Sequence, residues 1–285
     1  MPHVRAMRTG DSGGDRSTMR TGRQYPPARA EIPPAVTAAA VGRRVRAVWQ
    51  NRLGGLTCEA GTGPDRWFVK WMPAAGGTDL RGEAARLRWA APFTPVPRLV
   101  SQGRDESGSW LVTAALPGQN AASGRWQAQP QTAVRAIGEG LRAMHESLPV
   151  DSCPFSWSAE SRLAELRRQL SQGRLDPAWW SSPGPPLRTS QALDLLAGPP
   201  PIDRLVVCHG DSCAPNTLLT DDGHWSAHVD LGDLGLADRW ADLAIATWNV
   251  TLNYGPGWES LLLDAYGVPL DAARTGYYRL LGRCY

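Results

Sequence analysis

The stretch 207-VCHGDSCAPNTLLTDDGHWSAHVDLG-232 places three polar residues, Asp211, Asn216 and Asp230, in an apolar, strand-like part of the chain. Carboxylates and amides cost free energy when they leave water, so a core tolerates them mainly where they have a task. Asp211 follows an apolar predicted strand, and an Asp-Asp-Gly turn joins two further predicted strands. The pattern H-G-D-x4-N-x13-D therefore gathers the three side chains around one small hairpin.

This pattern has the composition of a phosphoryl-transfer site. A carboxylate just past a strand, here Asp211, can receive the proton of an attacking hydroxyl group. The oxygens of Asn216 and Asp230 are hard ligands of the kind that suits Mg²⁺. Taken singly, each aspartate is better explained as a turn or cap residue. The whole pattern is much more specific than any of its members, so we interpret it as a magnesium-dependent kinase site.

The chain contains a single lysine. Its 30 basic residues are all arginines except Lys70, which lies in the predicted strand 67-WFVK-70. An ammonium group is a compact point charge and a guanidinium group is a planar fork, so the two are not interchangeable at a phosphate site. Thirteen residues later, Glu83 lies on the helix predicted over 79–91, from which it could reach Lys70. We interpret Lys70 as a phosphate ligand; the alternative is an incidental surface lysine.

Composition describes an ordinary globular protein that does not bind nucleic acid. The 285 residues are 42% hydrophobic and 20% charged, and no run of about 18 apolar residues is present that could span a membrane. The net charge of +3 resides in residues 1–34, which hold six arginines and three acids. That segment has almost no apolar periodicity, so we expect a disordered N-terminal extension. The rest of the chain is neutral and lacks the basic stripe of a nucleic-acid-binding module.

Cysteine usage indicates a reducing compartment. The five cysteines are an odd number, and they are scattered without a C-x-x-C pair. This pattern is typical of free thiols, and the N-terminus lacks the apolar core of a secretory signal. We therefore predict a cytoplasmic location.

The order of predicted elements indicates an α+β fold in two lobes. Strands come first with one helix inserted, and a mostly helical part with a small hairpin follows. Pro117-Gly118 breaks the chain, so we predict a β-rich lobe over 35–116, a hinge near 112–118 and a larger helical lobe over 119–285. The predicted strands are 45–50, 66–71, 96–103, 109–116, 204–210, 216–221 and 225–232, and the predicted helices are 79–91, 130–148, 158–173, 191–198 and the segment after Asp238.

Together these residues resemble the aminoglycoside phosphotransferases, specifically the 3′-phosphotransferase (kanamycin kinase) type. The likeness runs from about Arg43 to the last residue. It implies a protein-kinase-like fold, ATP or GTP together with Mg²⁺ as cofactors, an aminoglycoside as the small-molecule substrate, and a monomer or homodimer. The reaction that it implies is ATP-dependent phosphorylation of the 3′-hydroxyl group, which confers antibiotic resistance.

The resemblance also assigns roles to individual residues. Asp211 would be the catalytic base and contact the substrate, while Asn216 and Asp230 would bind Mg²⁺. The nucleotide-binding residues would be Lys70 paired with Glu83, Gly54, Gly55 and Thr57 in the turn over the phosphates, and Thr113 and Ala115 in the hinge 112-VTAAL-116, whose backbone would bond to adenine. In the run 235-GLADRWADLA-244, Asp238 and Asp242 would brace the site.

The acceptor side departs from this family. Its members usually end in two acids and an aromatic residue, but here Gly282 and Arg283 stand at the acidic positions and only Tyr285 is retained. In 176-DPAWWSSP-183, two tryptophans replace most of the expected acids. Asp233 occupies a position that is usually basic. We expect Asp233 and Tyr285 to contact the substrate, and we expect aminoglycoside binding to be weakened or altered.

Three functions remain open from the sequence. The first is an aminoglycoside 3′-kinase, and the second is a kinase for another hydroxylated molecule, such as streptomycin at its 3″ position, a sugar or a macrolide. The third is a weakly active, kinase-like binding protein. Loss of any of Lys70, Asp211, Asn216 or Asp230 would favour the third, and all four are present.

Overall fold

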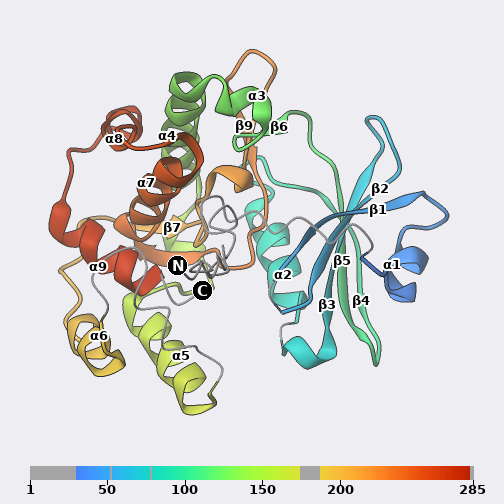
Figure 1. Ribbon diagram of the computed structural model, residues 1–285, viewed down its shortest axis with the longest axis horizontal. Helices are drawn as coiled ribbons and strands as arrows, with labels where there is room; N and C mark the ends of the chain where they lie inside the picture. Colours follow the sequence, from blue (N-terminus) through green and yellow to red (C-terminus); the bar gives the residue numbers. More distant parts are fainter. Residues whose placement is uncertain (1–29, 52, 78, 174–186, 283–285) are drawn as a thin grey trace, which may run out of the picture.

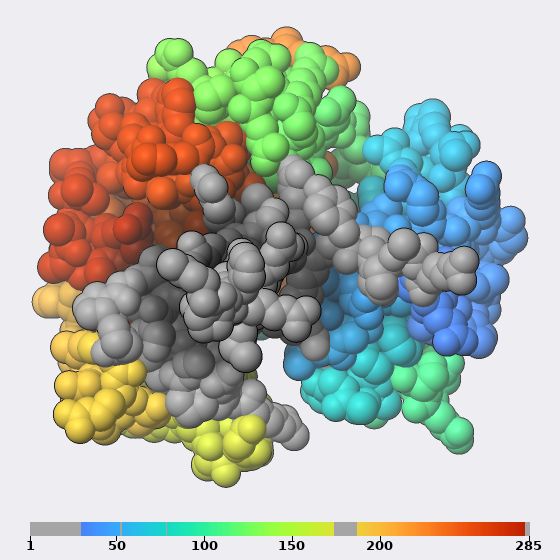
Figure 2. Space-filling model, in the orientation of Figure 1, coloured from blue at the N-terminus to red at the C-terminus, as the bar shows by residue number. Residues whose placement is uncertain are grey.

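The computed structural model describes residues 30–51, 53–77, 79–173 and 187–282. These residues form a smaller lobe built on one β-sheet and a larger, mostly helical lobe beside it (Figure 1). In the space-filling view the smaller lobe, blue to blue-green, lies on one side and the larger lobe, green to red, on the other (Figure 2). The α+β, two-lobe fold predicted from the sequence is confirmed.

The smaller lobe contains a five-stranded antiparallel sheet with the order β1-β2-β3-β5-β4. Its strands are β1 Val45–Gln50, β2 Leu56–Ala60, β3 Trp67–Pro73, β4 Leu99–Arg104 and β5 Gly108–Ala114. β2 lies in a stretch that the sequence indicated to be turns. Glycines flank it and its buried positions include only one large side chain, so its strand propensity was weak, and pairing on both edges stabilises it.

Helices cover both faces of this sheet. Helix α1 (Pro34–Ala39), which the sequence did not predict, packs on the outer face through Val36 against Val69 and Val112. Helix α2 (Arg81–Ala90) packs on the face toward the larger lobe through Leu80 and Leu87 (Figure 1). Lys70 therefore lies on a strand between two packed layers, with α2 on the side of the second lobe.

The larger lobe is built around α4. Its helices are α3 Gly124–Gln127, α4 Pro130–Ser147, α5 Ala159–Ser171, α6 Thr189–Leu196, α7 Trp240–Tyr254, α8 Glu259–Tyr266 and α9 Ala272–Gly282. Buried residues of α4, α7, α8 and α9 share one hydrophobic core. Ser158 caps the start of α5, because its side chain accepts a hydrogen bond from the Ser161 backbone nitrogen.

Two small sheets carry the polar residues of the quoted stretch. β7 (Leu205–Cys208) pairs with β10 (Gly235–Asp238), and β8 (Thr217–Leu219) pairs with β6 (Gln119–Asn120) and β9 (Trp225–His228). β10 was not predicted; its four residues are too short a run to reveal strand periodicity. The short 3₁₀ helices are Ala74–Gly76, Val150–Ser152 and Ala214–Asn216. In the described part of the chain, no helix has the length and apolar character needed to cross a membrane.

Candidate active site

The loop from His209 to Asn216 leaves β7 and is held at its start by one buried carboxylate. Asp242, on α7, accepts hydrogen bonds from the backbone nitrogens of His209 (2.6 Å) and Gly210 (2.9 Å). Gly210 has φ +87°, and a Cβ atom there would lie 2.4 Å from the Asp233 carbonyl oxygen. Only glycine fits this backbone, so the sequence His-Gly-Asp fixes where Asp211 emerges.

Asp242 is itself held by His145, and His145 is held in turn by Tyr266. The sequence interpretation missed both of these residues. The Nε2 atom of His145 lies 2.9 Å from Asp242, and its Nδ1 atom lies 2.8 Å from the Tyr266 hydroxyl group. Burial alone would raise the pKa of Asp242, but the contacts with His145 and His209 outweigh it, so the pKa lies below the usual 3.8. The available signal was His145 itself, a polar residue on the apolar face of α4.

His209 connects the loop 209–216, called the catalytic loop below, to the end of the β8–β9 hairpin. Its Nδ1 atom accepts a hydrogen bond from the Asp211 backbone nitrogen at 3.2 Å, so the ring presents Nε2 to the Val229 carbonyl oxygen at 3.0 Å. These two contacts define one neutral tautomer, protonated on Nε2. The histidine thus spans the distance between Asp211 and the residue that precedes Asp230.

Asn216 is placed against Asp211. Its Nδ2 atom donates to the backbone oxygen and to the Oδ2 atom of Asp211, both at 3.0 Å. The Asn216 Oδ1 atom accepts no hydrogen bond within the described residues. Burial, followed by the nearby carboxylates of Asp230 and Asp233, raises the pKa of Asp211 above its usual value. The loop therefore offers a basic carboxylate together with one amide oxygen.

Lys70 and Asp230 join the two lobes. The Lys70 Nζ atom lies 2.8 Å from Glu83 Oε2 and 2.5 Å from Asp230 Oδ1. Burial would lower the pKa of Lys70, but the charges of Asp230 and Glu83 raise it, and Lys70 in turn holds the pKa of Asp230 below its usual value. Asp230 has φ +64°, a strained backbone for a residue with a side chain and one often found at functional sites.

The turn before β2 is shaped by Asn51. Its Oδ1 atom accepts hydrogen bonds from the backbone nitrogens of Leu53 (3.0 Å) and Gly55 (2.7 Å), and Gly54 has φ +81°. Thr57 pairs with Lys70 across β2 and β3. The predicted phosphate-covering turn therefore lies at the end of the strand pair that carries the lysine.

In the predicted hinge, two backbone donors are already engaged. The Ala115 nitrogen donates to the Arg66 carbonyl oxygen at 3.0 Å, and the Ala114 nitrogen donates to Arg98 at 2.9 Å. Thr113 pairs with Phe68 of β3. Ala115 can therefore offer adenine its carbonyl oxygen, whereas the Leu116 nitrogen has no hydrogen-bond partner in the described part of the chain.

On the acceptor side, the structure places Asp233 next to an arginine. Asp233 Oδ1 lies 3.5 Å from the NH1 atom of Arg162 on α5. Gly282 is the last residue of α9. Arg283, Tyr285 and the segment 176–183 lie outside the described residues. Arg162 was not singled out from the sequence, since nothing distinguishes it there from the other arginines of α5.

The fold and this arrangement of Lys70, Glu83, Asp211, Asn216 and Asp230 are those of a kinase-like phosphotransferase. Residues 51–280 match the phosphotransferase enzyme family, and the chain belongs to that family. It is 37% identical to an aminoglycoside 3′-phosphotransferase of Streptomyces fradiae over 82% of this chain and 92% of that protein. It is also 32% identical to a streptomycin 3″-kinase of Streptomyces griseus over 74% of this chain and 82% of that protein.

Solved structures agree with this assignment. The crystal structure of an aminoglycoside-3′-phosphotransferase of type VIII superposes with a TM-score of 0.77 and 29% identity, covering 88% of this chain and 98% of the other. The aminoglycoside phosphotransferase APH(3″)-Id of Streptomyces rimosus superposes with a TM-score of 0.72 and 25% identity, covering 88% and 96%. The resemblance stated from the sequence is therefore confirmed.

Proposed function

We propose that the protein transfers the γ-phosphoryl group of ATP to the 3′-hydroxyl group of an aminoglycoside and thereby confers resistance to it. The observation that carries this proposal is the convergence of Lys70, Asp230, Asp211 and Asn216 through direct contacts. Similarity to the Streptomyces fradiae and Streptomyces ribosidificus aminoglycoside 3′-phosphotransferases, each at 37% identity, supports the acceptor.

Asp211 acts as the base in this proposal. As the acceptor oxygen bonds to the γ-phosphorus and the bond to the β,γ-bridging oxygen breaks, Asp211 takes the hydroxyl proton. Asn216 holds one carboxylate oxygen of Asp211 at 3.0 Å, and His209 holds its backbone nitrogen, so both the side chain and the main chain of the base are oriented. Such pre-organisation lowers the barrier because no reorganisation is needed during the reaction.

The donor set fits Mg²⁺. Asn216 directs its nitrogen to Asp211, which leaves Oδ1 available, and Asp230 uses Oδ1 toward Lys70, which leaves its second oxygen. Amide and carboxylate oxygens are suitable ligands for this ion. When bound, Mg²⁺ would neutralise charge on the β- and γ-phosphates. Asn216 and Asp230 are the residues that would hold it.

Lys70 holds the α- and β-phosphates, with Glu83 keeping the ammonium group in place at 2.8 Å. Gly54, Gly55 and Thr57 cover the phosphates. The hinge binds adenine through the backbone of Thr113 and the carbonyl oxygen of Ala115, with the Leu116 nitrogen as the backbone donor. In this scheme residues 35–116 form the nucleotide lobe and 119–285 the catalytic lobe, while 1–34 are an N-terminal extension.

The acceptor binds beyond Asp211, against Asp233 and the C-terminal Tyr285. A streptomycin 3″-kinase activity is the second candidate, favoured by the similarity to the Streptomyces griseus and Streptomyces rimosus proteins. Four described cysteines are free thiols, which supports a cytoplasmic location. A monomeric or homodimeric state and the choice between ATP and GTP are further parts of the proposal.

A coupled ADP-release assay against kanamycin, neomycin, streptomycin and hygromycin tests the proposal. We expect turnover with kanamycin or neomycin, a 3′-phosphate in the product by NMR, and a strongly reduced rate with Asp211→Asn. Phosphorylation of streptomycin alone would establish the second candidate. Absence of ADP release with every acceptor would refute both kinase functions and favour a binding protein.

A further inference from the structure

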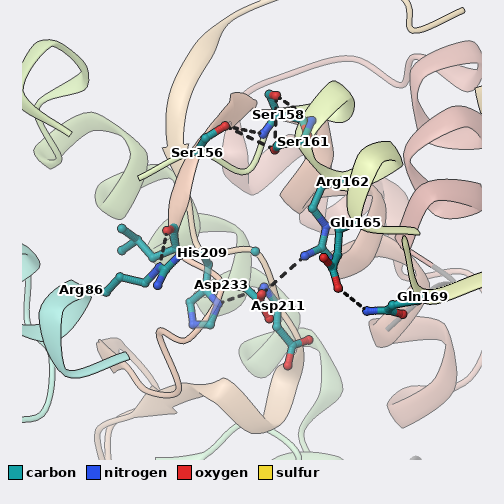
Figure 3. Close-up of polar contacts among 12 residues, drawn as sticks. Arg86, Ser156, Ser158, Ser161, Arg162, Glu165, Gln169, His209, Asp211 and Asp233 are labelled. Carbon is teal, nitrogen blue, oxygen red and sulfur yellow. Dashed lines mark hydrogen bonds and ion pairs between the residues drawn. The ribbon is translucent and has the colours of Figure 1, made fainter. Parts of the chain in front are cut away.

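One buried arginine faces the acceptor side of the catalytic loop. Arg162 extends from the first turn of α5 toward Asp211, in the loop after β7, and Asp233, in the loop between β9 and β10 (Figure 3). Only 10% of its side chain is exposed. Its NH1 atom lies 3.5 Å from Asp233 Oδ1, so this cation meets the acid that emerges just after Asp230.

An aromatic ring fixes the position of this cation. The Arg162 guanidinium carbon lies 4.2 Å from the centre of the Trp157 ring, and Trp157 is 3% exposed. The ring is wedged against the catalytic loop, since a Cβ atom on Gly210 would come within 2.6 Å of Trp157 Nε1. A guanidinium stacked on a fixed aromatic face has little freedom. Arg162 is therefore held at a constant position relative to Asp211.

Asp233 is the acid in this region that could attract a cationic acceptor. Its side chain is 48% exposed. Its negative charge is among the causes that raise the pKa values of Asp211 and Glu83. A carboxylate this close to the catalytic base and open to solvent would favour an ammonium group of the acceptor, unless another cation already compensates it.

One turn farther along α5, a second acid is compensated in the same way. Glu165 accepts hydrogen bonds from Arg168 at 2.6 and 2.8 Å and from Gln169 at 2.8 Å. Figure 3 shows Arg162, Glu165 and Gln169 on the side of α5 that faces the loop. We call Arg162, Glu165, Arg168 and Asp233 the acceptor wall. Each of its two acids is paired with an arginine, so the net charge of the wall is close to zero.

We propose that Arg162 is a specificity-determining residue, which lowers the affinity for polycationic acceptors by pairing with Asp233. The inference rests on the proposed aminoglycoside kinase function. The paired Asp233 contributes little attraction to the acceptor, and acceptors with fewer ammonium groups compete better than they would at an acidic wall. Arg162 contacts Asp233 and Trp157 on the acceptor side, so we expect its main effect on acceptor affinity and only a small effect on the nucleotide side.

The test compares Arg162→Met with a matched control, Arg167→Met. Arg167 lies exposed on the same helix, so its removal makes the same change in net charge. We expect Arg162→Met to lower the KM and the calorimetric Kd for neomycin about threefold to tenfold, and more than for kanamycin, which has fewer amino groups. The salt dependence of the neomycin KM should steepen. The KM for ATP should stay unchanged, and Arg167→Met should resemble wild type.

Asp233→Asn completes the cycle. In wild type it should change the neomycin Kd by less than about twofold, and in the Arg162→Met background it should restore the weaker binding. Arg162→Gln repeats the comparison if the methionine variant does not fold. An unchanged or higher Kd in the folded Arg162 variants would overturn the pairing proposal while wild-type turnover upholds the kinase function. If the wild-type protein neither binds nor phosphorylates an aminoglycoside, the proposed function fails. If it does bind neomycin, equal neomycin Kd values for the wild-type, Arg162 and Asp233 proteins would refute the role of Arg162.

Discussion

The two sides of Asp211 are built differently. Toward the nucleotide, the contacts of Lys70 with Glu83 and Asp230 and of Asn216 with Asp211 measure 2.5 to 3.0 Å. Toward the acceptor, the contact between Arg162 and Asp233 is 3.5 Å long, and Asp233 is half exposed. The chemistry is held by a closely bonded network, whereas the acceptor is met by a looser ion pair.

This difference follows from what each side must do. The nucleotide side handles one invariant group, a triphosphate, and a rigid site is the most effective way to stabilise its transition state. In the proposed function the acceptor side decides which hydroxylated molecule is admitted, and we expect a change of one charge there to alter the affinity more than the action of the base. Substitutions on the first side should therefore cost turnover, and those on the second should shift selectivity.

The largest effect should come from the network itself. Asp211→Asn should lower kcat by about 10²- to 10⁴-fold, because an amide cannot accept the hydroxyl proton. Asp230→Asn should lower kcat similarly and, unlike Asp211→Asn, raise the Mg²⁺ concentration needed for half-maximal rate. Steady-state kinetics across a magnesium titration measure both. Near wild-type turnover in folded variants would show that the constellation is structural.

Removing the brace behind the loop should affect stability. Asp242→Asn should lower the free energy of unfolding by about 3 to 5 kcal/mol near neutral pH, because it breaks a buried contact with His145 and weakens two backbone hydrogen bonds. Denaturant unfolding measures it, and kcat should fall as well, since Asp211 is no longer held in place. Tyr266→Phe, which keeps the carboxylate and removes only its remote support, is the milder control.

The loss of unfolding free energy in Asp242→Asn should depend on pH. Because the native pKa of Asp242 lies below its usual 3.8, the ionised carboxylate contributes its stability above that value and loses it as the pH falls through the native pKa. The difference in unfolding free energy between wild type and Asp242→Asn should stay constant from about pH 8 to about pH 5 and shrink below about pH 4. A difference that shrank already near pH 6 would point to another group.

The nucleotide side can also be weakened while its charge is kept. Lys70→Arg should lower kcat/KM for ATP by about tenfold to a hundredfold, since the planar fork cannot reproduce a compact ammonium group between Glu83 and Asp230. The aminoglycoside KM should change much less. Lys70→Met, which removes the charge, should be more damaging. Equal activity of all three proteins would eliminate the role assigned to the only lysine.

The sequence grouped the residues of the proposed nucleotide side because they carry local signals. Lys70 is the single lysine in a strand, and Asp211, Asn216 and Asp230 share one hairpin, so spacing alone brought them together. Helices α2, α4 and α5 began and ended within two residues of their predicted limits. Strand β2 was missed because its residues have weak strand propensity and are stabilised by neighbouring strands.

Among the residues that support the loop, Asp242 was expected from the family resemblance, whereas its partner His145 and the more distant Tyr266 could not be predicted because they depend on tertiary packing. His145 and Asp242 are 97 residues apart, and His145 and Tyr266 are 121 apart. No periodicity links α4, α7 and α8 at those positions. Arg162 is likewise one arginine among many until the fold stacks it on Trp157 and turns it toward Asp233. Sequence patterns group the candidate reacting residues, and only packing identifies what holds them or compensates their charge.

The smallest expected effect lies on the acceptor wall at Glu165. Hydrogen bonds from Arg168 and Gln169 hold the pKa of Glu165 below its usual value. An exposed pair one helical turn apart contributes at most about 1 kcal/mol. Glu165→Gln should therefore change the free energy of unfolding by less than about 0.5 kcal/mol and the neomycin KM by less than about threefold. Thermal unfolding and steady-state kinetics at two salt concentrations measure these. A rise in the neomycin KM beyond tenfold, abolished by high salt, would show that Glu165 binds the acceptor despite Arg168, and that the wall is acidic rather than neutral.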